Sequence, residues 1–323
     1  MNEMKLIKKS QNFTPLHQGL LFGIDTEAAL PSDLMVEIVD TSSSEVIATQ
    51  QLRGVVSAEV NVVPYLKRFT EYQPTLSTTG FEDAPTRACA IRVGENMSEK
   101  LLVSINKSSQ SMPAIVTTMP DTRRISPGES DELLLFVEAG DNLVANIETD
   151  TGETLTIDYT TVSGAVVFAI FADDFDSDSS TIAVEILRNG EHLTSLLYTL
   201  HALYKGGCRL AWISDEGAIE RYTFPIVAKR TKKSDKLYIG SGEHRRMVRS
   251  SSETEISLLS RYEPSAVIEP LTRIISSERV WIEHLGRCRE VTVVTSAIDS
   301  NLFGEPDRIE LVISEWSRGE AML

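Results

Sequence analysis

The chain has few cysteines and no long apolar run, and each absence excludes a class of protein. Its three cysteines, Cys89, Cys208 and Cys288, are odd in number and far apart, which argues against the disulfide scaffold of a small secreted domain. No stretch of about 20 consecutive apolar residues occurs, so no transmembrane helix is predicted. The first ten residues carry three lysines but no apolar segment. We therefore expect no signal peptide, and a protein that works where it is made or leaves the cell by lysis.

Motifs for catalysis and metal binding are also scarce. The five histidines lie in no nucleophile elbow. Asp174, Asp176 and Asp178 are spaced like the start of a calcium loop, with Glu185 at the twelfth position. Ser179 stands where such a loop needs glycine, and the flanking residues have strand patterns. We interpret the segment as an acidic connection between strands, with calcium as the alternative, and predict no catalytic residue and no cofactor.

The composition is that of a folded protein. Hydrophobic residues make up 41% and charged residues 24% of the 323 positions, unlike the composition of a disordered chain. The length exceeds what one ordinary core can bury, and two or three domains of about 100 residues each are expected.

The first predicted domain, residues 1–120, has the pattern of a β-sandwich. Short apolar runs bounded by Ser, Asp, Gly and Pro occur at 35–39, 45–48, 60–63, 88–93 and 100–105. Short strands at such spacing with little helix favour a sandwich. One helical turn is expected at 64–69.

The second predicted domain, residues 121–204, carries the clearest strand signals. Residues 132–137 form a continuous apolar run, typical of a buried central strand. Apolar residues alternate at 143–147 and 155–159, as in half-buried strands. Asn189-Gly190 predicts a tight hairpin turn between the strands on either side of it. An immunoglobulin-like sandwich without a disulfide is the expected fold.

The third predicted domain, residues 205–323, combines strands with one helix. Two apolar arms flank Asp215-Glu216-Gly217 and predict a hairpin, and a long ribbon follows from 225 to 262, broken near Gly240. Apolar spacing predicts a helix at about 265–277, in which Pro270 should delay the start or cause a kink. Strands are expected at 280–282, 291–294 and 309–313. We expect a strongly curved sheet plugged by the helix, with Leu271 and Ile274 packed against Trp281 and Val293.

Several segments of this third domain together resemble a known family. They are Leu210-Ala-Trp212, Gly217, Tyr222-Thr-Phe224, Lys229 to Lys236, Leu271 to Ser277 and Ile309 to Trp316. Their order resembles the C-terminal region of tail and baseplate proteins from phages and prophages of Bacteroidetes. The succession of strands, helix and strands is also similar to the split barrel of phage tail-tube and distal-tail proteins. The resemblance implies a non-enzymatic structural protein of the virion tail, made and assembled in the host bacterial cytoplasm. It also implies a homo-oligomeric ring that contacts other tail or baseplate proteins.

The net charge of −16 is unevenly distributed along the chain. Residues 121–200 hold 16 acidic and 3 basic residues, a net charge of −13, whereas residues 205–250 hold 11 basic and 5 acidic residues, a net charge of +6. Both blocks have a plain interpretation as solvated faces. Alternatively, the acidic middle of one subunit attracts the basic ribbon of the next. The candidate subunit-interface residues are Lys229, Arg230, Lys232, Lys233 and Lys236.

Two other functions are compatible with the residues. Strings of β-sandwiches are common in cell-surface adhesion and glycan-binding proteins, although the first ten residues argue against that class. A hydrolase with an unrecognised site is the remaining alternative. Trp212, Trp281 and Trp316 lie among alternating apolar residues of predicted strands, which favours core positions over a sugar-binding platform. We expect no specific nucleic-acid binding and no membrane insertion.

Overall fold

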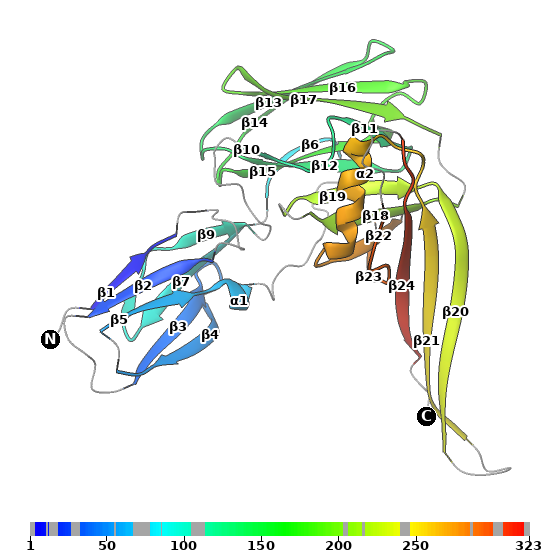
Figure 1. The fold of residues 1–323 in the computed structure, drawn as a ribbon. Coiled ribbons are helices and arrows are strands. Elements are labelled where there is room, and N and C mark those ends of the chain that lie inside the picture. Colours follow the sequence, from blue (N-terminus) through cyan, green and yellow to red (C-terminus); the bar gives the residue numbers. More distant parts are fainter. Residues whose placement is uncertain are drawn as a thin grey trace.

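The described part of the chain consists mainly of β-strands arranged in five sheets (Figure 1). The computed structural model describes residues 4–10, 12, 19–26, 33–54, 56–66, 78–84, 86–104, 114–202, 206–214, 217–239, 246–284, 287–299 and 306–319. These residues form two β-sandwiches followed by a curled sheet with one helix longer than a single turn. The predicted fold class, mainly β with two immunoglobulin-like sandwiches and a curved sheet plugged by a helix, is confirmed.

The first sandwich pairs a three-stranded sheet with a five-stranded one. The first sheet has the order β1 (Met4–Lys8), β2 (Leu21–Thr26), β5 (Ser57–Asn61). The second has the order β4 (Glu45–Leu52), β3 (Leu34–Asp40), β7 (Thr86–Val93), β8 (Asn96–Met97), and β9 (Leu101–Ser104) also pairs with β7. Alternate residues such as Phe22, Val36 and Ile91 are fully buried between the sheets, as the period of two in a strand requires. The expected helical turn is α1 (Val63–Leu66).

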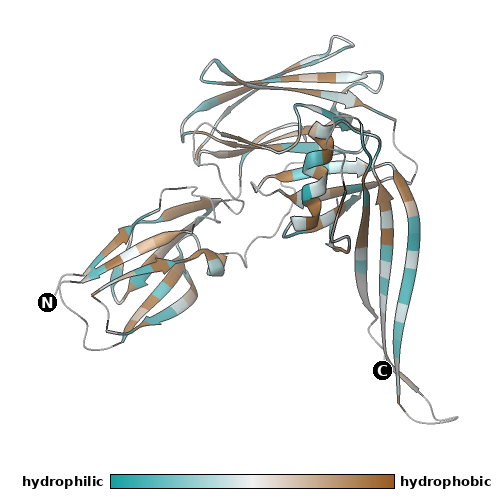
Figure 2. Ribbon diagram, in the orientation of Figure 1, coloured by the Kyte–Doolittle hydropathy of each residue, from teal (hydrophilic) through white to brown (hydrophobic). Residues whose placement is uncertain are grey.

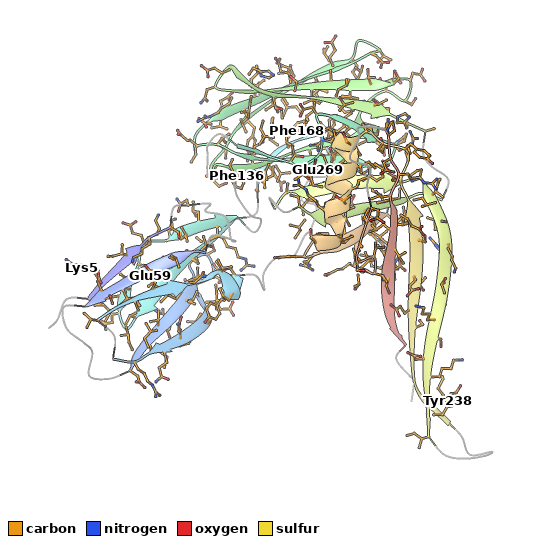
Figure 3. All side chains as sticks on the ribbon, viewed as in Figure 1. Lys5, Glu59, Phe136, Phe168, Tyr238 and Glu269 are labelled. Carbon is orange, nitrogen blue, oxygen red and sulfur yellow. The ribbon has the colours of Figure 1, made fainter. Side chains whose placement is uncertain are left out.

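The second sandwich pairs a four-stranded sheet with a five-stranded one. The four-stranded sheet has the order β10 (Ala114–Val116), β12 (Ser130–Phe136), β15 (Ala165–Phe171), β6 (Gly80–Asp83). The facing sheet has the order β11 (Thr122–Ile125), β17 (Glu191–Leu200), β16 (Thr181–Arg188), β13 (Asn142–Thr149), β14 (Thr154–Thr160). Neighbouring strands are antiparallel except β11 and β17, which are parallel. Phe168, labelled in Figure 3, is buried in the core between the two sheets.

Two strands of the second sandwich come from the range 1–120 expected for the first. β6 follows α1 in the chain but pairs with β15, so that Phe81 lies opposite Phe168. The chain then returns to the first sandwich at β7 and crosses again before β10. On the surface between the modules, Leu102 of β9 packs against a cluster that contains Phe136 and Ala218. The first two modules are therefore interwoven, because β6 exchanges hydrogen bonds with a strand about 85 positions later in the chain.

The Asn189-Gly190 prediction is confirmed. The turn joins β16 to β17, and both residues have positive φ, 51° and 83°. Positive φ at both central positions defines the type I′ turn, whose twist matches that of the flanking strands. Asn tolerates this left-handed region better than most residues, and Gly adopts it without steric cost.

The third module is a seven-stranded antiparallel sheet that curls around a helix (Figure 1). Its order is β19 (Ile219–Phe224), β18 (Cys208–Ile213), β22 (Val280–His284), β23 (Arg287–Val293), β24 (Glu310–Gly319), β21 (Arg246–Leu259), β20 (Ile226–Ile239). The predicted hairpins β18/β19 and β20/β21 are both present. The break expected near Gly240 lies outside the described residues, as do Asp215 and Glu216 of the first turn.

The helix plugs the sheet as expected, but one of its predicted partners is wrong. α2 (Ser265–Thr272) begins at Ser265 despite Pro270 and continues as the 3₁₀ turn η5 (Arg273–Ser276). Leu271 and Ile274 are fully buried in a cluster that includes Trp212, with Val293 packed against it. Trp281 instead belongs to a separate cluster with Ala211 and Ile219. Ala211 pairs directly with Trp281 across β18 and β22, so both point to the sheet face opposite Trp212.

Three strands of this sheet continue beyond the part that α2 covers. Figure 1 shows β20, β21 and β24 extending side by side away from the rest of the molecule, and we call this three-stranded extension the arm. Figure 2 shows that much of β20 is hydrophilic along the arm. Tyr238, labelled in Figure 3, lies near its far end.

Candidate functional site

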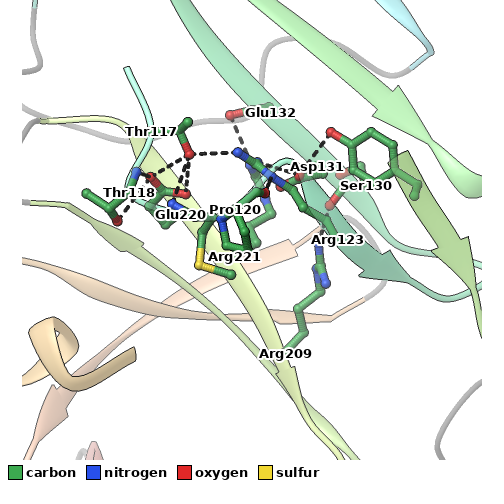
Figure 4. Close-up of polar contacts among 12 residues, drawn as sticks. Thr117, Thr118, Pro120, Arg123, Ser130, Asp131, Glu132, Arg209, Glu220 and Arg221 are labelled. Carbon is green, nitrogen blue, oxygen red and sulfur yellow. Dashed lines mark hydrogen bonds and ion pairs between the residues drawn. The ribbon is translucent and has the colours of Figure 1, made fainter. Parts of the chain in front are cut away.

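Two regions of the molecule gather charged side chains, one buried and one exposed. The buried region lies where the middle sandwich meets the C-terminal sheet, and Figure 4 shows the polar contacts around Arg123, Glu132 and Glu220. Its carboxylates come from β12, β19, β22 and the turn before β12, and its guanidinium groups from β11, β18 and β19. We call it the charged joint, made up of Arg123, Glu129, Asp131, Glu132, Arg209, Glu220, Arg221 and Glu283.

Arg209 links the two modules through three kinds of partner. Its Nη1 lies 3.2 Å from Oε2 of Glu129 and donates to Oγ1 of Thr223 at 2.9 Å. Its Nε donates to Glu283 on β22 at 3.3 Å, and its Nη2 donates to the carbonyl oxygen of Ser130. The planar guanidinium group can serve several acceptors at once, so one side chain ties β12 to the C-terminal sheet.

Arg221 repeats this arrangement one strand away. Its Nη2 lies 3.1 Å from Oε2 of Glu132, and its Nε donates to Oε1 of Glu283 at 3.0 Å. Its side chain is only 1% exposed. Glu283 therefore receives both arginines, and each arginine also pairs with a different carboxylate of the middle sandwich.

A second part of the charged joint surrounds Arg123. This side chain lies 2.7 Å from Oδ2 of Asp131, which also accepts the hydroxyl of Tyr198 at 3.1 Å. Glu220, on β19, accepts the backbone N–H of Thr118 at 2.6 Å and the hydroxyl of Thr117 at 3.0 Å. Every carboxylate of this group thus has donors from residues far away in the sequence.

The pKa values of these groups divide into two classes. Burial alone would raise the pKa of Asp131, but Arg123, Arg221 and Arg209 outweigh burial and hold it below its usual value. The pKa of Glu283 is lowered for the same reason, because Arg221 and Arg209 overcome burial. In Glu132 and Glu220 burial dominates, and their pKa values are raised. The arrangement holds two modules in one orientation and pairs its carboxylates with arginine or hydroxyl donors.

The sequence did not single out these residues, although a signal was present. Arg209, Glu220 and Arg221 interrupt otherwise apolar strand segments, at positions that the structure buries. A charged residue inside an apolar strand must find a partner or remain in water. The pattern therefore indicates buried ion pairs, but it does not identify the partners.

The structure does not assemble the four calcium candidates into a ligand set. Asp174 accepts the backbone N–H of Thr79 at 2.6 Å, and Asp176 accepts that of Asp178 at 3.1 Å. Glu185 lies on β16, where the side chain of Asn146 donates to it at 3.4 Å. No group of three or more His, Cys, Asp or Glu side chains within the described ranges could hold a metal ion. The segment connects β15 to β16, as the acidic-connection interpretation expected.

The five interface candidates lie together on β20, the edge strand of the arm. Lys229, Arg230, Lys232, Lys233 and Lys236 are all exposed. Lys233 pairs with Glu255 on the neighbouring strand. β20 carries five basic residues and one acidic residue, a net charge of +4. All five thus lie on one edge strand. Lys232, Lys233 and Lys236 lie on the arm, whereas Lys229 and Arg230 pair with Ser257 and Ile256 in the half that α2 covers.

The comparisons with known proteins give no family. No family model matches the chain, and no curated protein matches it. Among solved structures, the chain is similar to the chicken interferon gamma receptor alpha chain, at 8% identity over 62% of this chain and 98% of that chain, with a TM-score of 0.19. It is also similar to a tetra-tandem repeat from the extending region of a large adhesion protein, at 10% identity over 81% and 71% of the two chains, with a TM-score of 0.21. TM-scores this low transfer no function. Within the described residues, no helix is long and apolar enough to cross a membrane.

Proposed function

We propose that the chain is a non-enzymatic structural component of a phage or prophage-derived tail or baseplate, and that its copies assemble into a ring. The motifs from Leu210 to Trp316 support this proposal through their resemblance to tail and baseplate proteins. The observation that carries it in the structure is the arm, a three-stranded extension whose edge strand presents five exposed basic residues.

The arm has the properties of a contact element. β20 and β21 are each 14 residues long, more than twice the usual strand length of about 5–6 residues. The buried residues of β21 and β24, such as Ile256, Leu258 and Ile313, lie in the half covered by α2. Beyond them the strands contribute exposed side chains, among them Tyr238, Ile239 and Met247. A long extension whose described apolar side chains are exposed gains packing from a partner that covers them.

The lysines of β20 have two effects on association. Charged side chains on an edge strand discourage other chains from pairing with its free backbone groups. They also attract an acidic surface over a distance of about 8–10 Å at ordinary ionic strength. An arm of this kind resists indiscriminate strand pairing and favours a partner of opposite charge.

The middle sandwich offers such a surface on the same chain. The inward residues of β13 and β16 include Leu143, Ile147 and Val184, so the residues between them face outward. Glu148, Asp158 and Glu185 occupy exposed outward positions on neighbouring strands. Because the acidic face and the basic arm are different surfaces, a contact between them is head-to-tail, and such contacts form a ring when the rotation between successive subunits closes.

The charged joint gives this contact a fixed geometry. It ties the middle sandwich to the sheet that bears the arm. The angle between the basic arm and the acidic face of the middle sandwich is then constant within each subunit. A constant angle is what a ring of defined order needs.

The proposal is tested on purified virions from a producing strain. Antibody against the full chain, imaged by negative-stain electron microscopy, should label one position along the tail or at the baseplate. Labelling of the capsid, labelling of the producing cell's surface, or absence of the protein from virions would contradict the proposal. Cell-surface labelling would favour the adhesion alternative.

A further inference from the structure

A cavity of about 210 Å³ lies where the middle sandwich, the C-terminal sheet and the start of α2 meet. Its apolar lining includes Met119, Pro264 and Val267, and its polar lining includes Arg124, His201 and Arg261. Cavities between modules with an apolar wall and a few converging polar groups are the usual form of small-molecule sites. The proposed role in a tail makes no use of this cavity.

His201 is the polar group of this lining whose partner is missing. It follows β17, and its backbone N–H donates to the carbonyl oxygen of Ile125 at 3.1 Å, which fixes its position. The ring Nε2 atom is buried and has no hydrogen-bond partner among the residues that the structure describes. A buried polar atom without a partner destabilises the fold. A ligand in the cavity can provide the missing hydrogen bond.

The electrostatic environment of His201 favours a negatively charged group. Burial, Arg261 and Arg124 lower the pKa of His201, and together they outweigh the opposite effect of Glu263. Both carboxylate oxygens of Glu263 already accept from Arg124, at 2.6 and 2.7 Å, and one also accepts the hydroxyl of Tyr222 at 3.0 Å. The other two acids of the lining, Glu129 and Asp131, pair with Arg209 and Arg123. Every acid of the lining is thus paired with an arginine, and Arg261 and Arg124 outweigh Glu263 at the imidazole.

The start of α2 adds hydrogen-bond donors on the same side. Pro264 precedes the helix and provides no side-chain cap, and the first turn contains no acidic residue. The N–H groups of Val267 and Ile268 bond to the carbonyl oxygen of Pro264. The N–H groups of Ser265 and Ala266 have no acceptor within the helix, and Ala266 lines the cavity. A helix N-terminus carries a partial positive charge, which supports the preference for an anion.

The size of the cavity limits the ligand. An engineered apolar cavity of about 150 Å³ holds benzene, so the present volume has room for a six-membered ring with a carboxylate. We propose that the cavity binds a small organic monocarboxylate, with its oxygens beside His201, Arg124 and the first N–H groups of α2. Its apolar body packs against Met119 and Val267. Because the ligand touches both modules, its binding stabilises the orientation that the charged joint sets.

Calorimetric titration of the full chain tests the ligand class. The probes are benzoate, 3-methylbutanoate, the neutral isostere benzamide, and inorganic phosphate. We expect at least one of the two carboxylates to bind, and benzamide and phosphate to bind at least about tenfold more weakly. The class is wrong if neither carboxylate binds up to about 10 mM, or if benzamide or phosphate binds as tightly.

Two further measurements locate the site. His201→Leu and Arg124→Gln should each weaken carboxylate binding about tenfold or more, whereas Lys229→Gln on the edge strand β20 should leave it unchanged. If either of these two cavity variants fails to fold, the wild-type protein still decides the question. With ¹⁵N-labelled histidine, one of the five ring systems, assigned to His201, should shift its Nε2 resonance on addition of benzoate. Binding that leaves this resonance in place would assign the ligand to another site.

Discussion

The C-terminal module contains two groups of basic residues in opposite environments. Arg209 and Arg221 of the charged joint are at most 7% exposed and pair with carboxylates of two modules. The five basic residues of β20 are all exposed, on a strand with a free edge. The charge sign is the same, but the first group determines how the chain is held together, and the second is available to other molecules.

The comparison teaches that position decides what a charge does. Removing one partner of a buried pair leaves an uncompensated charge in a medium of low dielectric, which is strongly destabilising. An exposed charge is hydrated and screened, so its removal scarcely changes stability. We therefore expect joint variants to change folding and arm variants to change association, and four predictions test this division.

The largest loss of folding stability is expected from Arg221→Met. The substitution leaves Glu132 without its arginine and Glu283 with one of two, and breaking a buried pair in this way costs about 3–5 kcal/mol. The three tryptophans all lie in the C-terminal module, so urea unfolding followed by tryptophan fluorescence reports on that module. Lys229→Met is the matched control and should leave the midpoint nearly unchanged. Equal urea midpoints for the two variants would contradict the distinction between the buried arginines of the charged joint and the exposed basic residues of β20.

The second largest loss of stability is expected at a buried apolar residue, and it provides a comparison for the loss of the buried ion pair. Leu271 lies on the buried face of α2 and is fully buried, and Leu271→Ala should cost about 2–5 kcal/mol through lost contacts and a cavity. The same fluorescence measurement checks it. An unchanged midpoint would mean that the helix does not pack where the buried cluster places it, and the root of the arm would then lack its support.

The third effect concerns pH, and the two pKa classes act in opposite directions. Asp131 and Glu283 have lowered pKa values, so they stabilise the fold above their ordinary values of about 3.9 and 4.3 and lose this effect as pH falls below them. Glu132 and Glu220 have raised pKa values and oppose folding at neutral pH. Their opposition relaxes as pH falls from neutral toward about 4.3. We expect maximal stability at mildly acidic pH, measured by urea midpoints across pH 4 to 8.

The Glu132→Gln variant distinguishes the titration of the charged joint from the weaker repulsion between surface carboxylates at low pH. The substitution leaves every exposed carboxylate in place. Any rise in stability on acidification that remains in the variant therefore comes from groups other than Glu132. The rise between pH 7 and 5 should be smaller in the variant than in the wild type. An identical profile in the two proteins would show that Glu132 titrates like an exposed residue.

The smallest effect on stability is expected from changing Lys229, Arg230, Lys232 and Lys233 together to Ser. The melting temperature of the isolated subunit should scarcely move, since these side chains are exposed. Assembly should weaken, most visibly at low salt, because high salt screens the wild-type contact as well. Light scattering and negative-stain imaging at two salt concentrations measure this.

The acidic face provides the complementary test. Changing Glu148, Asp158 and Glu185 to their amides should weaken assembly to a similar extent, because these residues are exposed on the outer face of the middle sandwich. Normal assembly of the basic variant at low salt, or a wild-type chain that stays monomeric with its partners present, would place the interface elsewhere. The arm would then be only a solvated extension.

Local patterns predicted much of the secondary structure. The Asn189-Gly190 turn, the alternation in β13 and the helical spacing around Leu271 depend on residues a few positions apart. Backbone geometry fixes these periods, so they can be recognised in the sequence. β15 is not among the predicted strands, although its seven apolar residues form a continuous run like that of residues 132–137, which is typical of a buried strand.

Long-range pairing could not be predicted in this way. β6 has only four residues, and it pairs with β15, a strand from a distant part of the chain. Trp212 and Trp281 occupy similar apolar contexts, yet the pairing register of β18 and β22 puts them on opposite faces. A shift of one residue exchanges the two faces of a strand, and that register depends on strands brought together by folding.

The sequence by itself determined the composition of the charged blocks, the β-rich fold class and the location of five basic residues on one strand. The tertiary structure decided which charges are buried, because Arg209 meets Glu129 and Glu283 only after strands about 75–80 positions apart come together. It also decided that β20 lies at an edge of the sheet. The free energy of a charge depends on its hydration and on its partners, and the distance between residues along the chain specifies neither.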